Sequence, residues 1–276
     1  MSRKLLAALV TCAALVASAG ASPDRIKLLE GPAALSKLSP GQQNEDVRGY
    51  LATDVAPIVA GILPPPAIGS DTDKTDVEIF NEIYKGASAE RWKTALEDDA
   101  TMYDRFNGQV GLVVDRAHLP ALVALLNRVA ADTFNVTSVA KAKFPRPRPY
   151  QRFRLKRVCG MARVPAPEVS PGKGTSYPSG HASVSWAVAL VLEEVSPASA
   201  QAIIGRAVSY GNSRVVCGLH FPADIEASHY LASTVMAKLF QSPEFVHDLK
   251  CARREVEAVS RGEKAADLAA CEPLVP

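Results

Sequence analysis

The sequence lacks several features that would place it in a specialised class of protein. It has no internal repeat, no low-complexity tract and only one long apolar run, which lies at the N-terminus. A membrane-embedded protein is therefore disfavoured, because a spanning helix needs about 20 consecutive apolar residues. No C-x-x-C pair occurs, which argues against a zinc site. Strand-like alternation of apolar and polar residues is nearly absent, which argues against a β-sheet.

A net charge of one sign is also absent. Arg3 and Lys4 precede the apolar run 5–19, which ends in the small residues ASAGAS, and this pattern predicts a secretory signal peptide cleaved after Ala19 or Ala21. Of the 31 Lys and Arg residues these two leave with the signal peptide, so 29 remain against 29 acidic residues. A neutral chain gives no reason to expect general nucleic-acid binding.

The cysteines fit an exported protein. Cys12 would leave with the signal peptide, and a lipoprotein signal is disfavoured because a Thr directly precedes it. Cys159, Cys217, Cys251 and Cys271 remain, an even number, and three pairings are possible. A bond between Cys251 and Cys271 would close a short C-terminal loop. Free buried thiols are the alternative.

The apolar pattern is helical from about residue 75 onward. We expect helices over 75–86, over 88–100 after an N-cap at Ser88, and over 119–143, where PRPRP ends the helical pattern. Further helices begin at Ser179 and in PADIEASHYLASTVMAKLF. With 47% apolar residues the chain can bury a sizeable core. The sequence therefore predicts an all-α fold, a compact helical bundle in a single domain.

The first cluster of candidate site residues is KAKFPRPRP. Lys141 lies near the end of the helix expected over 119–143, and Arg148 follows seven residues later. A solvated basic helix end is the alternative, because the helix dipole favours cations there. However, three prolines restrain Arg146 and Arg148, which therefore have little entropy to lose. A restrained guanidinium group suits bidentate recognition of phosphate.

The second cluster is PSGH, in which Pro178 precedes Ser179, Gly180 and His181. Ser179 is a good N-cap, so Gly180 and His181 would begin the next helix. The first turn of a helix has free N–H groups and a positive dipole end, and a glycine lets an anion approach the backbone. The alternative is an ordinary capped helix with a surface histidine.

The third cluster is SRVVCGLHFPAD, in which the proline suits the first position of a helix. His220 would then lie just before that helix and Asp224 in its first turn. A carboxylate that reaches back to the imidazole fixes its tautomer and leaves the other nitrogen with a free lone pair. Ser213 and Arg214 would add a donor and a second guanidinium. The alternative is a capped helix with an incidental histidine.

Together the clusters follow the patterns K-x6-R-P, P-S-G-H and S-R-x5-H-x3-D, in this order. This set of residues suits an anion site that contains a nucleophile and an acid. It provides cations, a serine, a glycine N–H and two histidines, one of which has an aspartate behind it. The three motifs resemble the type 2 phosphatidic acid phosphatase superfamily, which also includes vanadium haloperoxidases. The wider stretches ILPPPAIGS, EDDA, RPRPY, SYPSGHAS and YGNSRVVCGLHFPADIEA look like the class A non-specific acid phosphatases of bacterial periplasms.

The resemblance covers roughly residues 60–240 and implies a soluble, secreted, all-α enzyme that hydrolyses many phosphomonoesters without a metal or other cofactor. The sequence departs from the family pattern at Ala182, where a Thr is usual, and at Tyr150, where a Phe is usual. Neither departure removes a catalytic group.

The resemblance also implies a role for each motif residue. His220 would attack phosphorus and form a phosphohistidine, Asp224 would hold and polarise His220, and His181 would protonate the leaving alcohol and then activate water. The residues expected to hold the phosphate oxygens are Lys141, Arg148, Ser179, Gly180 and Arg214. Arg146 would either assist or lie at the surface. The histidines that match no motif, and are expected to be structural or solvated, are His118, His229 and His247.

These expectations define the organisation of the chain: a signal peptide over 1–21, an N-terminal extension over 22–57, a catalytic domain over 58–245 and a C-terminal tail over 246–276. Localisation would be periplasmic or secreted. Cys159 follows the Arg148 segment, and Cys217 lies between Arg214 and His220. If both segments line one phosphate site, Cys159 and Cys217 should be joined by a disulfide. The expected partners are small phosphomonoesters, with vanadate or phosphate as inhibitors, and neither nucleic acid nor a membrane; a homo-oligomer stays open.

Several alternatives share these residues. A vanadium haloperoxidase would use the same pocket for vanadate, and a phosphotransferase would pass the phosphoryl group to an alcohol. In a metallo-hydrolase, His181, His220 and Asp224 would be metal ligands. A phosphate-binding protein without turnover is disfavoured, because binding alone needs no oriented nucleophile. A membrane lipid phosphatase is disfavoured by the lack of spanning segments.

Overall fold

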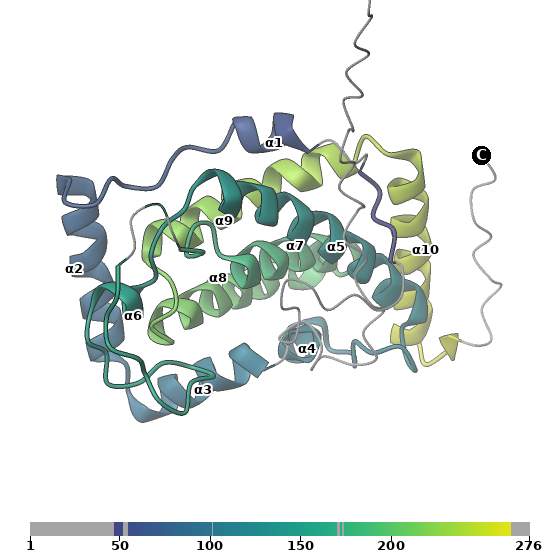
Figure 1. Ribbon diagram of the computed structural model, residues 1–276. Coiled ribbons are helices and arrows are strands. Elements are labelled where there is room, and N and C mark those ends of the chain that lie inside the picture. Colours follow the sequence, from purple (N-terminus) through teal and green to yellow (C-terminus); the bar gives the residue numbers. More distant parts are fainter. Residues whose placement is uncertain (1–46, 52–54, 101, 170–171, 173, 266–276) are drawn as a thin grey trace, which may run out of the picture.

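The computed structural model describes residues 47–51, 55–100, 102–169, 172 and 174–265, which form a helical body (Figure 1). Its α-helices are α1 (Ala56–Ala60), α2 (Asp71–Gly86), α3 (Ala89–Ala100), α4 (Asn107–Val110), α5 (Pro120–Lys143), α6 (Pro149–Arg152), α7 (Gly180–Val195), α8 (Ala200–Val216), α9 (Pro222–Leu239) and α10 (Pro243–Ser260). No β-sheet occurs among the described residues, so the predicted all-α class is confirmed. The predicted signal peptide lies outside these residues.

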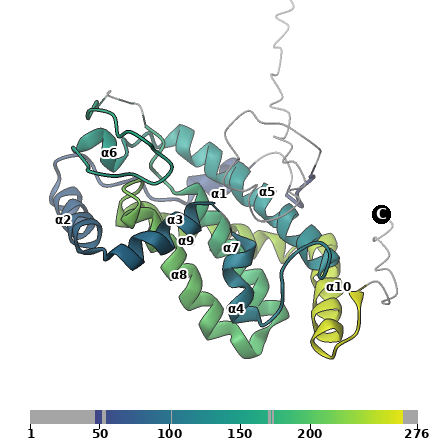
Figure 2. The same ribbon diagram turned by 90° about the horizontal axis from the view of Figure 1, so that it is seen from below.

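Helix α7 is at the centre of the bundle and packs against α5, α8, α9 and α10 (Figures 1 and 2). Its sequence explains this position, because no charged residue occurs between His181 and Glu193. A helix that is apolar around most of its circumference is stable only when neighbours cover it on all sides. The N-terminus of α7, which carries PSGH, is therefore fixed by the core itself.

Serine N-caps determine where several helices begin. The hydroxyl oxygen accepts a hydrogen bond from the backbone N–H three residues later at Ser70, Ser88, Ser179 and Ser242. Such a bond satisfies one of the N–H groups that have no partner within the helix. The N-caps predicted at Ser88 and Ser179 are thus confirmed, and Gly86 ends α2 as expected.

The long helix α5 begins at Pro120 without a side-chain cap of its own. Glu255 of α10 supplies one, because its carboxylate accepts hydrogen bonds from the backbone N–H groups of Ala121 at 3.0 Å and Leu122 at 2.8 Å. A buried carboxylate at this position also interacts favourably with the helix dipole. Because Phe245 of α10 also lies in the main core, α10 belongs to the same folded body as α5 and α7.

The three motif clusters meet at one end of the bundle. They lie at the C-terminus of α5 and in the segment that follows it, at the N-terminus of α7, and between α8 and α9. The backbone N–H of Ser179 donates to Ser228 Oγ of α9 at 2.8 Å, which joins two of these ends directly. None of the described helices is both long enough and apolar enough to cross a bilayer.

Candidate active site

The PSGH motif forms the start of α7 as the sequence predicts. Ser179 is fully buried, and its hydroxyl oxygen accepts the Ala182 N–H at 3.3 Å. A Cβ atom added to Gly180 would meet no atom within 4 Å, so the space outside this backbone is open. The first turn of α7 can therefore present its N–H groups and positive dipole end to an anion.

The His181 ring follows directly, and its Nε2 atom is buried without a hydrogen-bond partner among the described residues. The same holds for Nε of Arg214. Buried polar atoms are nearly always paired, so a bound anion or a water can supply the partner of these two atoms. Burial, and then the charges of Arg214 and the other cations nearby, hold the pKa of His181 well below its usual value.

Lys141, at the end of α5, is held by backbone carbonyls. Its Nζ atom donates to Thr175 O at 2.5 Å and also to Pro178 O. Burial, and then the charge of Arg148, lowers the pKa of Lys141 to about 7. An anion bound beside it would favour the charged form. In the free enzyme the Lys141 ammonium is therefore fully charged only below about pH 7.

Arg148 lies between the Thr175 carbonyl, which also binds Lys141, and His220, the candidate nucleophile. Its Nη1 atom is 3.3 Å from Nε2 of His220, and Nη2 donates to Thr175 O at 3.4 Å. The segment that contains Thr175 passes directly against the RPRP backbone, because a Cβ on Gly174 would lie 2.1 Å from Arg146 O. A glycine is required for this approach.

His220 is oriented mainly by a backbone carbonyl. Its Nδ1 atom lies 2.8 Å from Ser176 O and 3.5 Å from Asp224 Oδ2. The carboxylate reaches back as predicted, but the short hydrogen bond is made to Ser176. Because a carbonyl oxygen only accepts, Nδ1 carries the proton and Nε2 keeps its lone pair. Burial, and then the charge of Arg148, lowers the pKa of His220 to about 3, against the opposing effect of Asp224.

Asp224 is completely buried in the first turn of α9. Its carboxylate accepts hydrogen bonds from Ser176 Oγ at 2.5 Å, Arg146 Nη1 at 2.7 Å and the Phe221 N–H at 2.8 Å. Burial alone would raise the pKa of Asp224, but the interactions with His220 and Arg146 hold it well below the usual range. Arg146 is 1% exposed, so it does not lie at the surface, which was one of its two expected positions.

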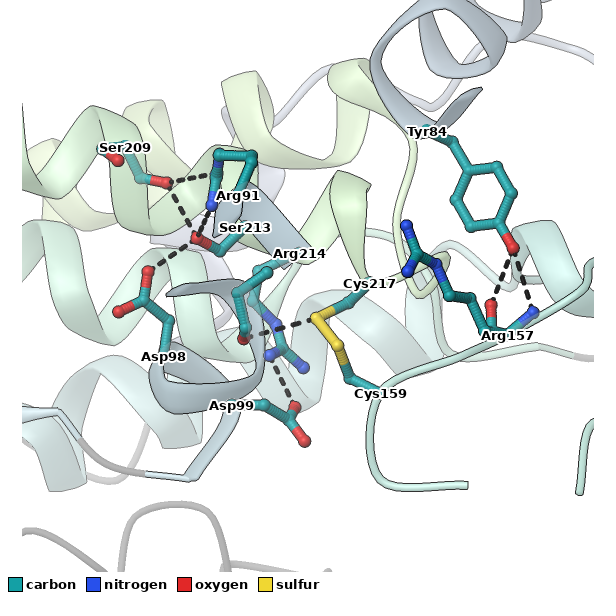
Figure 3. Close-up of a disulfide and its surroundings, with 11 residues drawn as sticks. Tyr84, Arg91, Asp98, Asp99, Arg157, Cys159, Ser209, Ser213, Arg214 and Cys217 are labelled. Carbon is teal, nitrogen blue, oxygen red and sulfur yellow. Dashed lines mark hydrogen bonds and ion pairs between the residues drawn. A yellow bond between two sulfur atoms is a disulfide. The ribbon is translucent and has the colours of Figure 1, made fainter. Parts of the chain in front are cut away.

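Arg214 lies near the end of α8, where its Nη1 atom donates to Asp99 Oδ1 at 2.6 Å (Figure 3). The sequence did not identify Asp99 as a partner. Ser213 was expected to add a donor to the site, and this expectation is wrong. Its hydroxyl donates to Asp98 Oδ2 at 2.6 Å and accepts from Arg91 Nη1 at 2.9 Å, so it belongs to a neighbouring polar network.

The predicted disulfide between Cys159 and Cys217 is present (Figure 3). The Cys159 N–H also donates to Cys217 O at 3.2 Å. This crosslink fixes the turn between Arg214 and His220. Cys251 is disulfide-bonded as well. Because Cys271 lies outside the described residues, a bond between Cys251 and Cys271 stays a prediction.

The histidines outside the three motifs are elsewhere in the fold. His118 is largely exposed and pairs with Asp115, His229 stacks on Trp186, and His247 lies on α10. Within the described ranges, no group of three or more His, Cys, Asp or Glu side chains is arranged to hold a metal ion.

Comparison with known proteins shows the family of the chain. Residues 118–246 match the PAP2 superfamily. The chain is 32% identical over 200 residues to an acid phosphatase of Zymomonas mobilis. These 200 aligned residues are 71% of this chain and 74% of the relative. Non-specific acid phosphatases of Providencia stuartii and Salmonella typhimurium are each 31% identical over 198 residues, or 70% of this chain and 77% of the relative. The chain therefore belongs to the PAP2 superfamily and, within it, to the family of the bacterial non-specific acid phosphatases.

Proposed function

We propose that this protein is a periplasmic or secreted acid phosphatase that hydrolyses small phosphomonoesters through a phosphohistidine, without a metal. The observation that supports this most strongly is the state of His220. Ser176 O holds the proton on Nδ1, and Nε2 faces Arg148 in a cluster of cations. This is an oriented nucleophile beside an anion site, which binding alone would not need.

In the first step, Nε2 of His220 attacks phosphorus, and the bond between phosphorus and the leaving oxygen breaks. Nδ1 keeps its proton, so the phosphorylated ring is cationic, and Asp224 Oδ2 at 3.5 Å stabilises this charge. Arg148, Lys141, Arg214 and the N-terminus of α7 hold the phosphoryl oxygens. Phosphoryl transfer depends mainly on such positioning and charge stabilisation, a task that Mg²⁺ performs in other enzymes.

His181 provides the proton for the leaving oxygen. Because its pKa is lowered in the free enzyme, we expect the proton to arrive with the substrate. A phosphomonoester has a second pKa near 6 and is therefore a monoanion in mild acid. Its proton passes to His181 and then to the departing alkoxide. In the second step His181 takes a proton from water, the water oxygen attacks phosphorus, and the P–N bond to His220 breaks.

Turnover of p-nitrophenyl phosphate across about pH 4 to 8, with EDTA and with vanadate, tests this function. We expect activity that is highest in mild acid, unaffected by EDTA and inhibited by vanadate. Loss of activity with EDTA would indicate a metallo-hydrolase. Bromide oxidation with added vanadate, without phosphatase activity, would indicate a haloperoxidase. Added alcohols would reveal phosphotransfer through a phosphorylated alcohol product.

Lys141 predicts how anion affinity depends on pH. Inhibition by sulfate should be constant in mild acid and should weaken as the pH rises through about 7, where Lys141 loses its proton. Sulfate is the appropriate probe because, unlike phosphate, it does not titrate in this range. Inhibition of the Lys141→Met variant should be weak throughout and should lack this step. An inhibition constant that stays flat through neutral pH in the wild-type enzyme would contradict the assignment.

A further inference from the structure

A network of buried charges lies beside Asp224, the carboxylate next to His220. Arg146 is at its centre and bridges two helices. Its Nη1 atom donates to Asp224 Oδ1 on α9 at 2.7 Å, and Nη2 donates to Asp76 Oδ2 on α2 at 2.7 Å. Asp76 Oδ1 in turn accepts the Ala223 N–H at 2.9 Å. Through Arg146, α2 is connected to the carboxylate beside His220.

The network continues along α2. Asp73 accepts hydrogen bonds from Arg152 Nη1 at 2.7 Å and Nη2 at 2.8 Å, and it lies 3.4 Å from Arg146 Nη2. The Phe221 ring packs against both guanidinium groups, with Arg146 Cζ 4.4 Å and Arg152 Cζ 5.1 Å from its centroid. Burying so many charges is costly even when they are paired, so stability is a weak explanation for the network.

The position of the network suggests an electrostatic role. Both terminal nitrogens of Arg146 are used by carboxylates, so its side chain acts on the site through Asp224. The charged groups around His220 and Asp224 come from every neighbouring element: Lys141 of α5, Arg146 and Arg148 before α6, His181 of α7, Arg214 of α8, Asp73 and Asp76 of α2, and Asp99 of α3. Arg146 is the cation that contacts the Asp224 carboxylate.

We propose that Arg146 is a positioning residue for the nucleophile: it aligns Asp224 and offsets its charge, so that His220 stays unprotonated in mild acid. The inference rests on the proposed function and deepens it, because it explains how a histidine nucleophile beside a carboxylate remains reactive at low pH. A carboxylate without this cation would draw a proton onto the imidazole. Burial and Arg148 lower the pKa of His220 to about 3 against the opposing effect of Asp224, and this opposing effect is the one that Arg146 would limit.

The Arg146→Gln variant tests this. Removing the positive charge should raise the pKa of His220 by roughly 1 unit, because Asp224 would then act on the imidazole without an offsetting cation. The fall of kcat/KM on the acid side of its pH profile, its acid limb, would then occur at a higher pH, where it can be measured. KM at the pH optimum should change little, because both terminal nitrogens of Arg146 are held by the carboxylates of Asp224 and Asp76. Arg146→Lys should give a smaller shift, because an ammonium keeps the charge but cannot bridge both carboxylates with separate nitrogens.

Arg152→Gln is the matched control, because Arg152 belongs to the same network and contacts Asp73 but makes no ion pair with Asp224. It should lower thermal stability and leave the acid limb in place. Equal shifts in Arg146→Gln and Arg152→Gln would overturn the proposal, as would a folded Arg146→Gln with an unchanged limb. If Arg146→Gln does not fold, Arg146→Lys decides, and the absence of any shift in it overturns the proposal.

A second readout separates this proposal from the proposed function. The imidazole NMR signals of His220, assigned by their loss in His220→Ala, report its protonation without any turnover. If the wild-type protein has no phosphatase activity, the proposed function fails, but the His220 titration still decides the role of Arg146. An unchanged titration in both Arg146 variants contradicts that role even in an active enzyme.

Discussion

Replacement of His220 by alanine should reduce turnover of p-nitrophenyl phosphate by several orders of magnitude, while phosphate binding weakens only modestly. The reason is that different groups bind the phosphate and attack the phosphorus. In the proposed mechanism the imidazole Nε2 makes the bond to phosphorus, whereas the ground-state anion is held by Lys141, Arg148, Arg214 and the N-terminus of α7. Both values can be measured on one preparation, with kcat from nitrophenol release and affinity from inhibition by phosphate.

His118→Ala is the matched control for this variant. His118 is largely exposed and pairs with Asp115 far from the motif residues in sequence, so its removal should leave both values unchanged. If His220→Ala retains more than a few per cent of wild-type activity, another group is the nucleophile. If phosphate affinity falls as steeply as turnover, the imidazole is a binding group instead.

Replacement of His181 by asparagine should slow the enzyme by an amount that depends on the leaving group. Loss of a general acid costs about 10²- to 10⁴-fold when the departing group is an alkoxide that needs a proton. The loss should be much smaller on p-nitrophenyl phosphate, because nitrophenolate is stable without a proton. The measurement is kcat/KM for a series of alkyl and aryl phosphates of increasing leaving-group acidity, in the wild-type enzyme and in His181→Asn.

A steeper dependence on the leaving-group pKa in the variant would identify His181 as the acid. Equal slowing of alkyl and nitrophenyl esters would mean that His181 is not the leaving-group acid, and PSGH would then be an anion cradle alone. His229→Asn is a useful comparison, because this histidine is partly buried but stacks on Trp186. It should not change the leaving-group dependence.

Much of the fold could be predicted from local signals. The signals that end or begin helices act within a few residues: serine N-caps, prolines at the first helical position and the proline-rich segment after α5. The sequence therefore predicts the helix ends at Ser88, Ser179 and Lys143. The central position of α7 also follows from its composition. The capping of α5 by Glu255 could not be predicted, because it joins positions more than 130 residues apart.

The site was only partly predictable, for a physical reason. The side chains of the three motifs were identified, but the groups that orient them include backbone carbonyls. The carbonyls of Thr175, Ser176 and Pro178 hold Lys141, Arg148 and His220, and every residue type carries such an oxygen. A motif of side chains therefore contains no signal for them.

The carboxylates of α2 were missed for a different reason. Asp73 and Asp76 lie on the same buried face as Phe80, at a spacing that would otherwise indicate a solvated polar face. Their burial depends on Arg146 and Arg152, and the bonded pairs Asp76–Arg146 and Asp73–Arg152 are 70 and 79 residues apart. Only the folded structure distinguishes these aspartates from ordinary surface charges.

The proposed mechanism requires a covalent phosphoryl-enzyme, and rapid-quench mass spectrometry of the enzyme during turnover detects this intermediate. Because phosphohistidine is labile in acid, the quench should be alkaline and denaturing. We expect one added phosphoryl group on the peptide that contains His220, absent in His220→Ala and still formed from p-nitrophenyl phosphate in His181→Asn. A phosphoryl group on another residue, or none during steady turnover of an active enzyme, would contradict the account.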